Sequence, residues 1–152
     1  VTSGNSSQIS DGAAAVIVTS EAIAKSAGLK IQARIEDYTW AANTPAELFE
    51  APSFAIQKLL DGSNMTLADI SLLEINEAFS AQVVANAKSL KLDLDKVNIN
   101  GGAVALGHPI GASGSRILVT LINSMQQKNL ENGIATLCHG GGGAVGIRIS
   151  ID

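Results

Sequence analysis

His108 is the first residue whose type and setting could do chemistry, because it lies in a loop rich in glycine. Five glycines fall between residues 101 and 114, and Pro109 follows the histidine directly. Glycine lets a backbone approach a bound molecule closely and adopt conformations that a Cβ forbids. Imidazole changes its charge near neutral pH, so His108 can transfer protons, although a loop histidine can equally be structural. The loop leads into a helix with an apolar face, so we expect His108 just ahead of a helix N-terminus.

Asn76 and Cys138 are two further candidates, because each follows a short apolar run. Asn76 comes after residues 72–75 and before a helical pattern, where asparagine is a favoured N-cap, so capping is the alternative to a catalytic role. Cys138 comes after residues 134–137 and is the only cysteine of the chain, so it has no disulfide partner within it. It can be a small buried hydrophobe. The four glycines at 140–143 also allow a reactive thiol beside exposed backbone N–H groups.

Composition restricts the class of protein. The 152 residues suffice for one domain with a core but not for two ordinary domains. The formal net charge is −4 and no block of basic residues occurs, which argues against nucleic acid or an anionic membrane surface as the main partner. No apolar run is long enough to cross a bilayer, no metal-ligand cluster is visible, and no glycine run ends in the Gly-Lys-Ser/Thr of a P-loop. Because the first residue is not Met, we expect an excised piece of a longer protein.

Hydrophobic periodicity predicts strands that alternate with helices, followed by a hairpin. This order is typical of a layered α/β domain with a mixed sheet, whose ligand-binding loops follow the strand ends. The predicted strands are residues 13–19, 31–40, 72–75, 97–100, 134–138 and 144–151. The predicted helices are residues 21–27, 54–60, 76–90 and 117–125.

Three motifs taken together resemble the C-terminal half of the thiolase family, nearest to the acetyl-CoA acetyltransferases. They are Asn76-Glu-Ala-Phe, Gly107-His-Pro-Ile-Gly-Ala-Ser-Gly and Cys138-His-Gly-Gly-Gly, in that order and about thirty residues apart. The resemblance implies a thiolase-like α/β layered domain with a mixed five-stranded sheet between helices. Residues 1–28 then match the tail end of the family's N-terminal half, and residues 29–152 match its C-terminal domain.

The resemblance also implies roles in a condensation of two acetyl-CoA molecules to acetoacetyl-CoA and CoA, or in the reverse thiolysis. Cys138 matches the acid/base that takes a proton from the acetyl methyl group. Gly140 matches a residue whose backbone N–H lies in one oxyanion hole. His108 matches the residue that activates the nucleophile and donates to a second oxyanion hole, and Asn76 matches one that holds a water there.

Further matches concern substrate and partners. Ser7 matches a serine that touches the pantetheine of CoA, Ala78 and Phe79 match positions along the thioester and pantetheine path, and Leu48 matches an apolar position near the CoA. The family uses coenzyme A thioesters as substrates without a further cofactor, and it forms homodimers or homotetramers. We expect a cytosolic protein, with the mitochondrion as the alternative.

One essential part of a thiolase is absent, because the acylated cysteine belongs to the N-terminal half of the family. We therefore expect the missing half to be a required partner and the chain to be inactive alone. His139 departs from the family pattern, and we assign it no role. Three other readings stay open: a longer-chain 3-ketoacyl-CoA thiolase, a non-catalytic CoA-binding or assembly module, and a ketoacyl synthase, whose members have histidine where Asn76 stands.

Overall fold

A mixed sheet of four strands forms the centre of the computed structural model, which describes residues 1–151. The strands are β1 (Arg34–Ala42), β2 (Leu72–Ile75), β3 (Asn132–His139) and β4 (Gly143–Ser150). Their order across the sheet is β1-β4-β3-β2. The β1–β4 and β3–β4 pairs are antiparallel, whereas β2 and β3 are parallel, so their carboxyl ends meet at one edge of the sheet.

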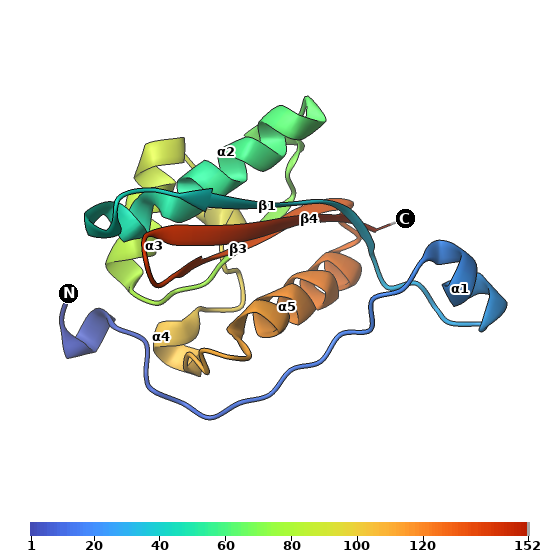
Figure 1. Cartoon of the computed structure of the whole chain (residues 1–152), viewed down its shortest axis with the longest axis horizontal. Helices are drawn as coiled ribbons and strands as arrows, with labels where there is room; N and C mark the ends of the chain where they lie inside the picture. Colours follow the sequence, from blue (N-terminus) through green and yellow to red (C-terminus); the bar gives the residue numbers. More distant parts are fainter. Residues whose placement is uncertain (152) are drawn as a thin grey trace.

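Helices cover both faces of the sheet, as Figure 1 shows. The helices α2 (Ala51–Ser63) and α3 (Ser80–Leu90) lie on one face, where Ile56, Leu59 and Ile134 belong to the same buried cluster. The helix α5 (Ser113–Lys128) lies on the other face, where Ile117, Leu121 and Met125 pack with Leu72 and Ile149. The remaining elements are α1 (Glu21–Ser26), α4 (Ala103–Leu106) and the 3-10 turns η1 (Ser3–Asn5), η2 (Pro45–Glu50), η3 (Leu67–Asp69) and η4 (Leu94–Lys96). No helix in residues 1–151 is long and apolar enough to cross a membrane.

Several sequence predictions are confirmed. The strand predicted at residues 72–75 is β2, and the predicted hairpin is β3–β4. The helix α1 begins after Ser20, whose hydroxyl accepts a hydrogen bond from the backbone N–H of Ile23 at 3.3 Å, as its N-cap position predicts.

The predicted five-stranded sheet is wrong by one strand, because residues 97–100 do not form one. Val97 makes a single bridge to Leu73, and the next residue, Asn98, takes a left-handed φ of 49°. The side chain of Asn98 then accepts from the backbone N–H of Ile75 and donates to its carbonyl, both at 2.8 Å. The amide group of Asn98 therefore pairs with the edge of β2 where a fifth strand's backbone would do so.

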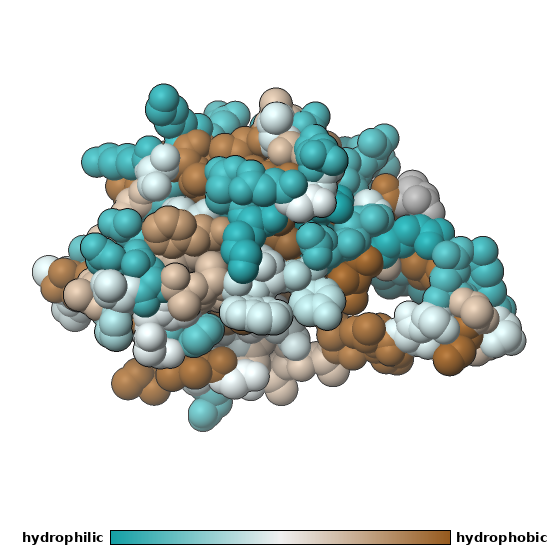
Figure 2. Space-filling model, turned by 45° about the horizontal axis from the view of Figure 1, so that its top comes forward, coloured by the Kyte–Doolittle hydropathy of each residue, from teal (hydrophilic) through white to brown (hydrophobic). Residues whose placement is uncertain are grey.

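Two other predictions are corrected. Residues 13–19 run as an unpaired segment with Ile17 86% exposed, because a strand buried on both faces needs neighbouring strands that residues 1–151 do not offer here. Figure 2 shows apolar surface on the extended N-terminal part, and a hollow separates this part from α5. The helix predicted from Asn76 begins only at Ser80, with Phe79 at its N-cap. The capping role considered for Asn76 is therefore wrong.

Gly133 tests the packing of α5 on β3. A Cβ at Gly133 would lie 2.5 Å from the Sδ of Met125 and 2.9 Å from the Cδ1 of Leu121, and both side chains are fully buried. We predict that Gly133→Ala lowers the free energy of unfolding by about 1–3 kcal/mol through overpacking. Urea unfolding measures this change. The matched control is Gly111→Ala, where a Cβ meets no atom within 4 Å; equal stability of the two variants would contradict the packing described.

Candidate functional site

The parallel pair β2–β3 positions the first candidate residue. The backbone N–H of Asn76, directly after β2, donates to the carbonyl of Thr136 on β3 at 2.9 Å. Thr136 precedes Cys138 by two residues, so the ends of both strands bring Asn76 and the cysteine to one edge of the sheet. Asn76 is only 1% exposed, so its side-chain amide must find its hydrogen bonds inside the protein.

His108 joins Asn76 and the first turn of α5. The Nε2 of His108 lies 3.4 Å from the Nδ2 of Asn76, and its Nδ1 lies 2.6 Å from the Oγ of Ser113. The Ser113 hydroxyl also lies 3.0 Å from the carbonyl of Pro109, to which it can donate its one hydrogen. We assign the hydrogen to this bond, so that Ser113 accepts from His108 and the ring proton lies on Nδ1. The lone pair of Nε2 consequently faces the Nδ2–H of Asn76.

The environment of His108 favours the neutral ring. Burial lowers the pKa of His108, and the positive charge of Arg116 lowers it further. A neutral imidazole with its lone pair on Nε2 can accept a proton from a nearby thiol and can then donate that N–H to an oxygen anion.

Arg116 and Glu74 lie behind Asn76. The Nη2 of Arg116 donates to the Oδ1 of Asn76 at 3.1 Å, and its Nη1 lies 3.9 Å from the Oε2 of Glu74. Glu74 is 3% exposed, and burial raises its pKa to about 7 although Arg116 opposes the shift. The Nε and Nη1 of Arg116 are buried and have no hydrogen-bond partner among residues 1–151. This pair is therefore an imperfectly satisfied buried ion pair, which is weak as a source of stability.

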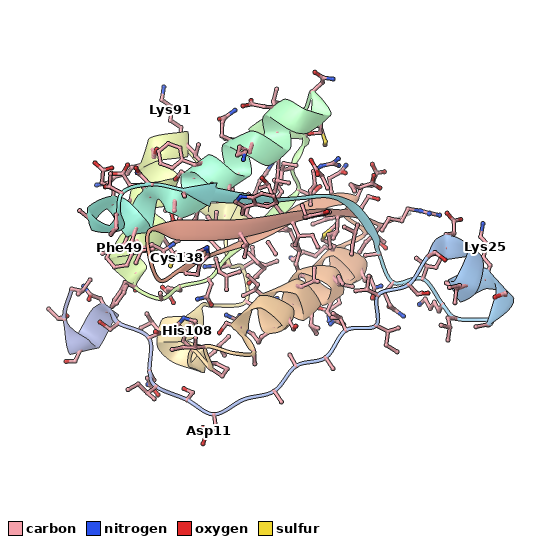
Figure 3. All side chains as sticks on the ribbon, in the orientation of Figure 1. Asp11, Lys25, Phe49, Lys91, His108 and Cys138 are labelled. Atoms are coloured by element: carbon pink, nitrogen blue, oxygen red, sulfur yellow. The ribbon has the colours of Figure 1, made fainter. Side chains whose placement is uncertain are left out.

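Cys138 is the last residue but one of β3 and lies half-buried before the glycine turn into β4. Figure 3 shows it at the same end of the molecule as His108. Burial raises the pKa of the Cys138 thiol, so it holds its proton at neutral pH. Gly140, two residues on, is exposed, and a Cβ there would meet no atom within 4 Å. The turn thus leaves open space beside the backbone at Gly140.

The predicted CoA-contacting residues lie on two adjoining segments. The backbone N–H of Ser7 donates to the carbonyl of Ala78 at 2.9 Å, and the carbonyl of the next residue, Gln8, accepts from the N–H of His108 at 3.1 Å. The ring of Phe79 meets that of Phe49 edge-on, with centroids 5.0 Å apart. The N-terminal segment is thereby bonded to both the Asn76 corner and the His108 loop.

The fourth of these residues, Leu48, is half-buried in η2 beside Phe49. Leu48 is therefore linked to Phe79 only through the next residue, Phe49, whose ring contacts that of Phe79. Four predicted residues gather around the two strand ends and the His108 loop, namely Asn76, His108, Cys138 and Gly140.

Sequence reasoning missed Ser113, Arg116 and Glu74. The available signal was charge: Glu74 interrupts a run of apolar residues in β2, and Arg116 begins a helix whose inner face is apolar. A charged residue in each of two elements that pack together predicts a buried pair. No group of three or more potential metal ligands occurs in the described part of the chain, 1–151.

Comparisons with known proteins agree with this geometry. The family model described as "Thiolase, C-terminal domain" matches residues 29–151. The acetyl-CoA acetyltransferase of Escherichia coli is 52% identical over 149 residues, which are 98% of this chain and 38% of that protein. The structure of the Bacillus anthracis acetyl-CoA acetyltransferase matches 99% of this chain and 38% of its own, at 48% identity and a TM-score of 0.96. Human mitochondrial 3-ketoacyl-CoA thiolase in complex with CoA matches 100% of this chain and 38% of its own, at 39% identity and a TM-score of 0.97.

The fold and the strand-end site thus define an α/β protein of thiolase architecture, as the sequence predicts, with four strands in place of five. The chain belongs to the thiolase family and contains its C-terminal domain. It spans somewhat less than two-fifths of the length of the curated relatives that it matches.

The raised pKa of Glu74 gives a stability prediction. Burial favours the protonated carboxyl in the folded state, with a pKa of about 7 against an ordinary 4.5. Its contribution to stability is therefore complete below pH 4.5 and is lost as the pH rises to about 7. A shift of one pKa unit corresponds to ~1.4 kcal/mol. We therefore predict that, as the pH rises from 4.5 to about 7, the free energy of unfolding of the wild type falls by up to about 3 kcal/mol relative to that of Glu74→Gln.

Urea unfolding of both proteins across this pH range measures the difference. The Gln variant has a side chain of the same shape that does not titrate. The effects of all other titrating groups therefore cancel in the difference between the two proteins. A wild type that gains stability relative to the variant on raising the pH would show that Glu74 ionises readily in the fold.

Proposed function

We propose that this chain supplies the acid/base thiol and the oxyanion-binding imidazole and amide of an acetyl-CoA C-acetyltransferase. The observation that supports this most directly is the hydrogen-bonded pair of Asn76 and His108 at the edge of the sheet where Cys138 lies near the end of β3. The nucleophilic cysteine comes from the portion of a thiolase that the chain does not span. The chain alone is accordingly inactive.

In the thiolysis direction, the sulfur of that cysteine attacks the ketone carbon of acetoacetyl-CoA while its proton passes to the Nε2 of His108. The new Nε2–H and a water held by Asn76 form one of the two oxyanion holes that stabilise the oxygen anions of the reaction. The bond between the ketone carbon and the adjacent methylene carbon then breaks, and its electron pair leaves as the enolate of acetyl-CoA. Cys138 gives this carbon a proton, for which its raised pKa keeps the thiol ready. The thiol of CoA then gives its proton to Cys138 and attacks the acetyl-cysteine, whose sulfur leaves with the proton held by His108, so that a second acetyl-CoA forms. Condensation is the same sequence reversed, with Cys138 as the base.

The backbone N–H of Gly140 contributes to the other oxyanion hole of the reaction. The open space at this glycine, where a Cβ meets nothing within 4 Å, supports the assignment. Ser7, Ala78, Phe79 and Leu48 line the path of the pantetheine, in agreement with the adjoining positions of the first three. The CoA thioesters are substrates, and the proposed reaction uses no further cofactor.

Residues 1–28 belong to the end of the N-terminal half and bring Ser7 to the site. The exposed apolar residues Ile17 and Val18 support a packing partner for this segment, which we propose is the N-terminal portion of the enzyme. We propose a cytosolic enzyme that forms homodimers or homotetramers, as its family does.

Sequence identity to known structures favours acetoacetyl-CoA over longer 3-ketoacyl-CoA thioesters as the substrate. The acetyl-CoA acetyltransferase structure is 48% identical to the chain, and the 3-ketoacyl-CoA thiolase structure is 39% identical. The TM-scores of 0.96 and 0.97 do not separate the two classes.

The test is CoA-dependent cleavage of acetoacetyl-CoA by an extended polypeptide, in which the Escherichia coli relative supplies the portion that this chain does not span. We predict turnover by the extended polypeptide and none by the chain alone. Cys138→Ser should lower kcat by about 10²- to 10⁴-fold, because the serine hydroxyl is a far weaker acid/base at this carbon. Gln57→Ala on the outer face of α2 is the control and should keep full activity.

Three results would contradict the proposal. A folded Cys138→Ser protein with undiminished kcat would remove the cysteine from the reaction. A marked preference for 3-ketodecanoyl-CoA over acetoacetyl-CoA would assign the chain to longer substrates. A folded extended polypeptide that binds CoA but cleaves neither substrate would identify a non-catalytic module.

A further inference from the structure

The two ends of the Asn76 amide differ in chemistry, so its orientation matters for the site. The Nδ2 group faces the lone pair of His108 Nε2 at 3.4 Å and can donate to it. A flipped amide would instead place the Oδ1 lone pairs against that nitrogen, which is repulsive. Asn76 is buried, so an interaction inside the protein must select between the two orientations.

Arg116 makes that interaction. Its Nη2 donates to the Oδ1 of Asn76 at 3.1 Å, and Oδ1 is the end that must point away from His108. Arginine can only donate, so a flipped amide would turn its own N–H groups toward the guanidinium and lose this bond. The contacts to Arg116 and to His108 therefore both favour the same orientation.

Glu74 lies on the other side of the guanidinium, without a hydrogen bond to it. Residues 74 and 76 are two apart at the end of β2, so their side chains leave the same face of the sheet, the face that α5 covers. Arg116 reaches both from α5, with Nη2 on Asn76 and Nη1 3.9 Å from Glu74. A planar group with separate donors suits two partners placed side by side, and a lysine ammonium does not.

We propose that Arg116 is a positioning residue, which acts on the reaction through Asn76 by setting the orientation of its side-chain amide. This inference rests on the proposed function of the Asn76–His108 pair. It also explains why an ion pair of low value for stability lies buried between β2 and α5.

The variant Arg116→Gln in the extended polypeptide tests the proposal. We expect kcat for acetoacetyl-CoA cleavage to fall about 10- to 100-fold, the range for loss of one charge-assisted hydrogen bond. KM should change by less than about twofold, since the orientation of Asn76 matters for the oxyanion and not for substrate binding. The double variant Glu74→Gln/Arg116→Gln leaves no unpaired buried carboxylate and should show the same loss, so poor folding of the single variant does not prevent the measurement.

Arg148→Gln is the matched control. Arg148 is on β4, where it pairs with Ile134 near the opposite end of β3, and its Nε is also buried without a hydrogen-bond partner among residues 1–151. Both variants remove a partly buried arginine from the same domain. A kcat that falls equally in the two would show a general structural effect and overturn the proposal.

A double-mutant cycle with Asn76→Ala separates positioning from stability. If Arg116 acts through Asn76, then Arg116→Gln should have little further effect on kcat in the Asn76→Ala background. Independent, additive losses would overturn the proposal. So would an unchanged kcat in Arg116→Gln, or a rise in KM alone.

A second readout does not depend on turnover. In the NMR spectrum of the folded polypeptide, the side-chain amide signals of Asn76 should be slow to exchange in the wild type and in Arg148→Gln. Faster exchange is expected in Arg116→Gln, and unchanged exchange would overturn the positioning role. If the wild type were inactive but exchange were faster in Arg116→Gln, the proposed function would be refuted, whereas the orientation of the Asn76 amide by Arg116 would still hold.

Discussion

The proton position on His108 depends on which acceptor receives the one hydrogen of the Ser113 hydroxyl, and we assign that hydrogen to the carbonyl of Pro109. With its hydrogen committed, Ser113 accepts from Nδ1 at 2.6 Å, and Nε2 is left with a lone pair. Asn76 donates toward that lone pair, and Arg116 donates to Asn76. In these four hydrogen bonds each group donates to the next, from Arg116 through Asn76, His108 and Ser113 to the carbonyl of Pro109. A change in the protonation of one group therefore requires the neighbouring hydrogen bonds to rearrange as well.

The sheet and α5 supply the positions for this chain of donors. Parallel pairing of β2 with β3 brings Asn76 beside the strand that contains Cys138 near its end, and α5 contributes both Ser113 and Arg116 from its first turn. Glu74 on β2, two residues before Asn76, lies 3.9 Å from the guanidinium. Burying this ion pair costs free energy, which the apolar packing of Ile117, Leu121 and Met125 on the sheet offsets. The site therefore depends on the same helix–sheet contact that forms one of the buried clusters of the core.

Much of this arrangement can be predicted from the sequence, because it depends on local patterns. Apolar runs followed by polar or glycine-rich residues indicate where Asn76, His108 and Cys138 lie, and three ordered motifs indicate the thiolase family. The missing fifth strand could not be predicted, because the side chain of Asn98 replaces a backbone partner, which strand propensity does not describe. Residues 13–19 have a strand pattern but lack neighbouring strands within the described chain. The link between Arg116 and Asn76 joins residues forty positions apart, so it becomes visible only when α5 is placed on β2.

The proton position on His108 is the most direct test of the site. We would record long-range ¹H–¹⁵N correlations of the His108 ring near neutral pH, with Ser113→Ala as the comparison. We predict a neutral ring protonated on Nδ1 in the wild type, and a mixture of tautomers once the Ser113 acceptor is removed. A wild-type ring protonated on Nε2, or on both nitrogens, would contradict the donor chain on which the site depends.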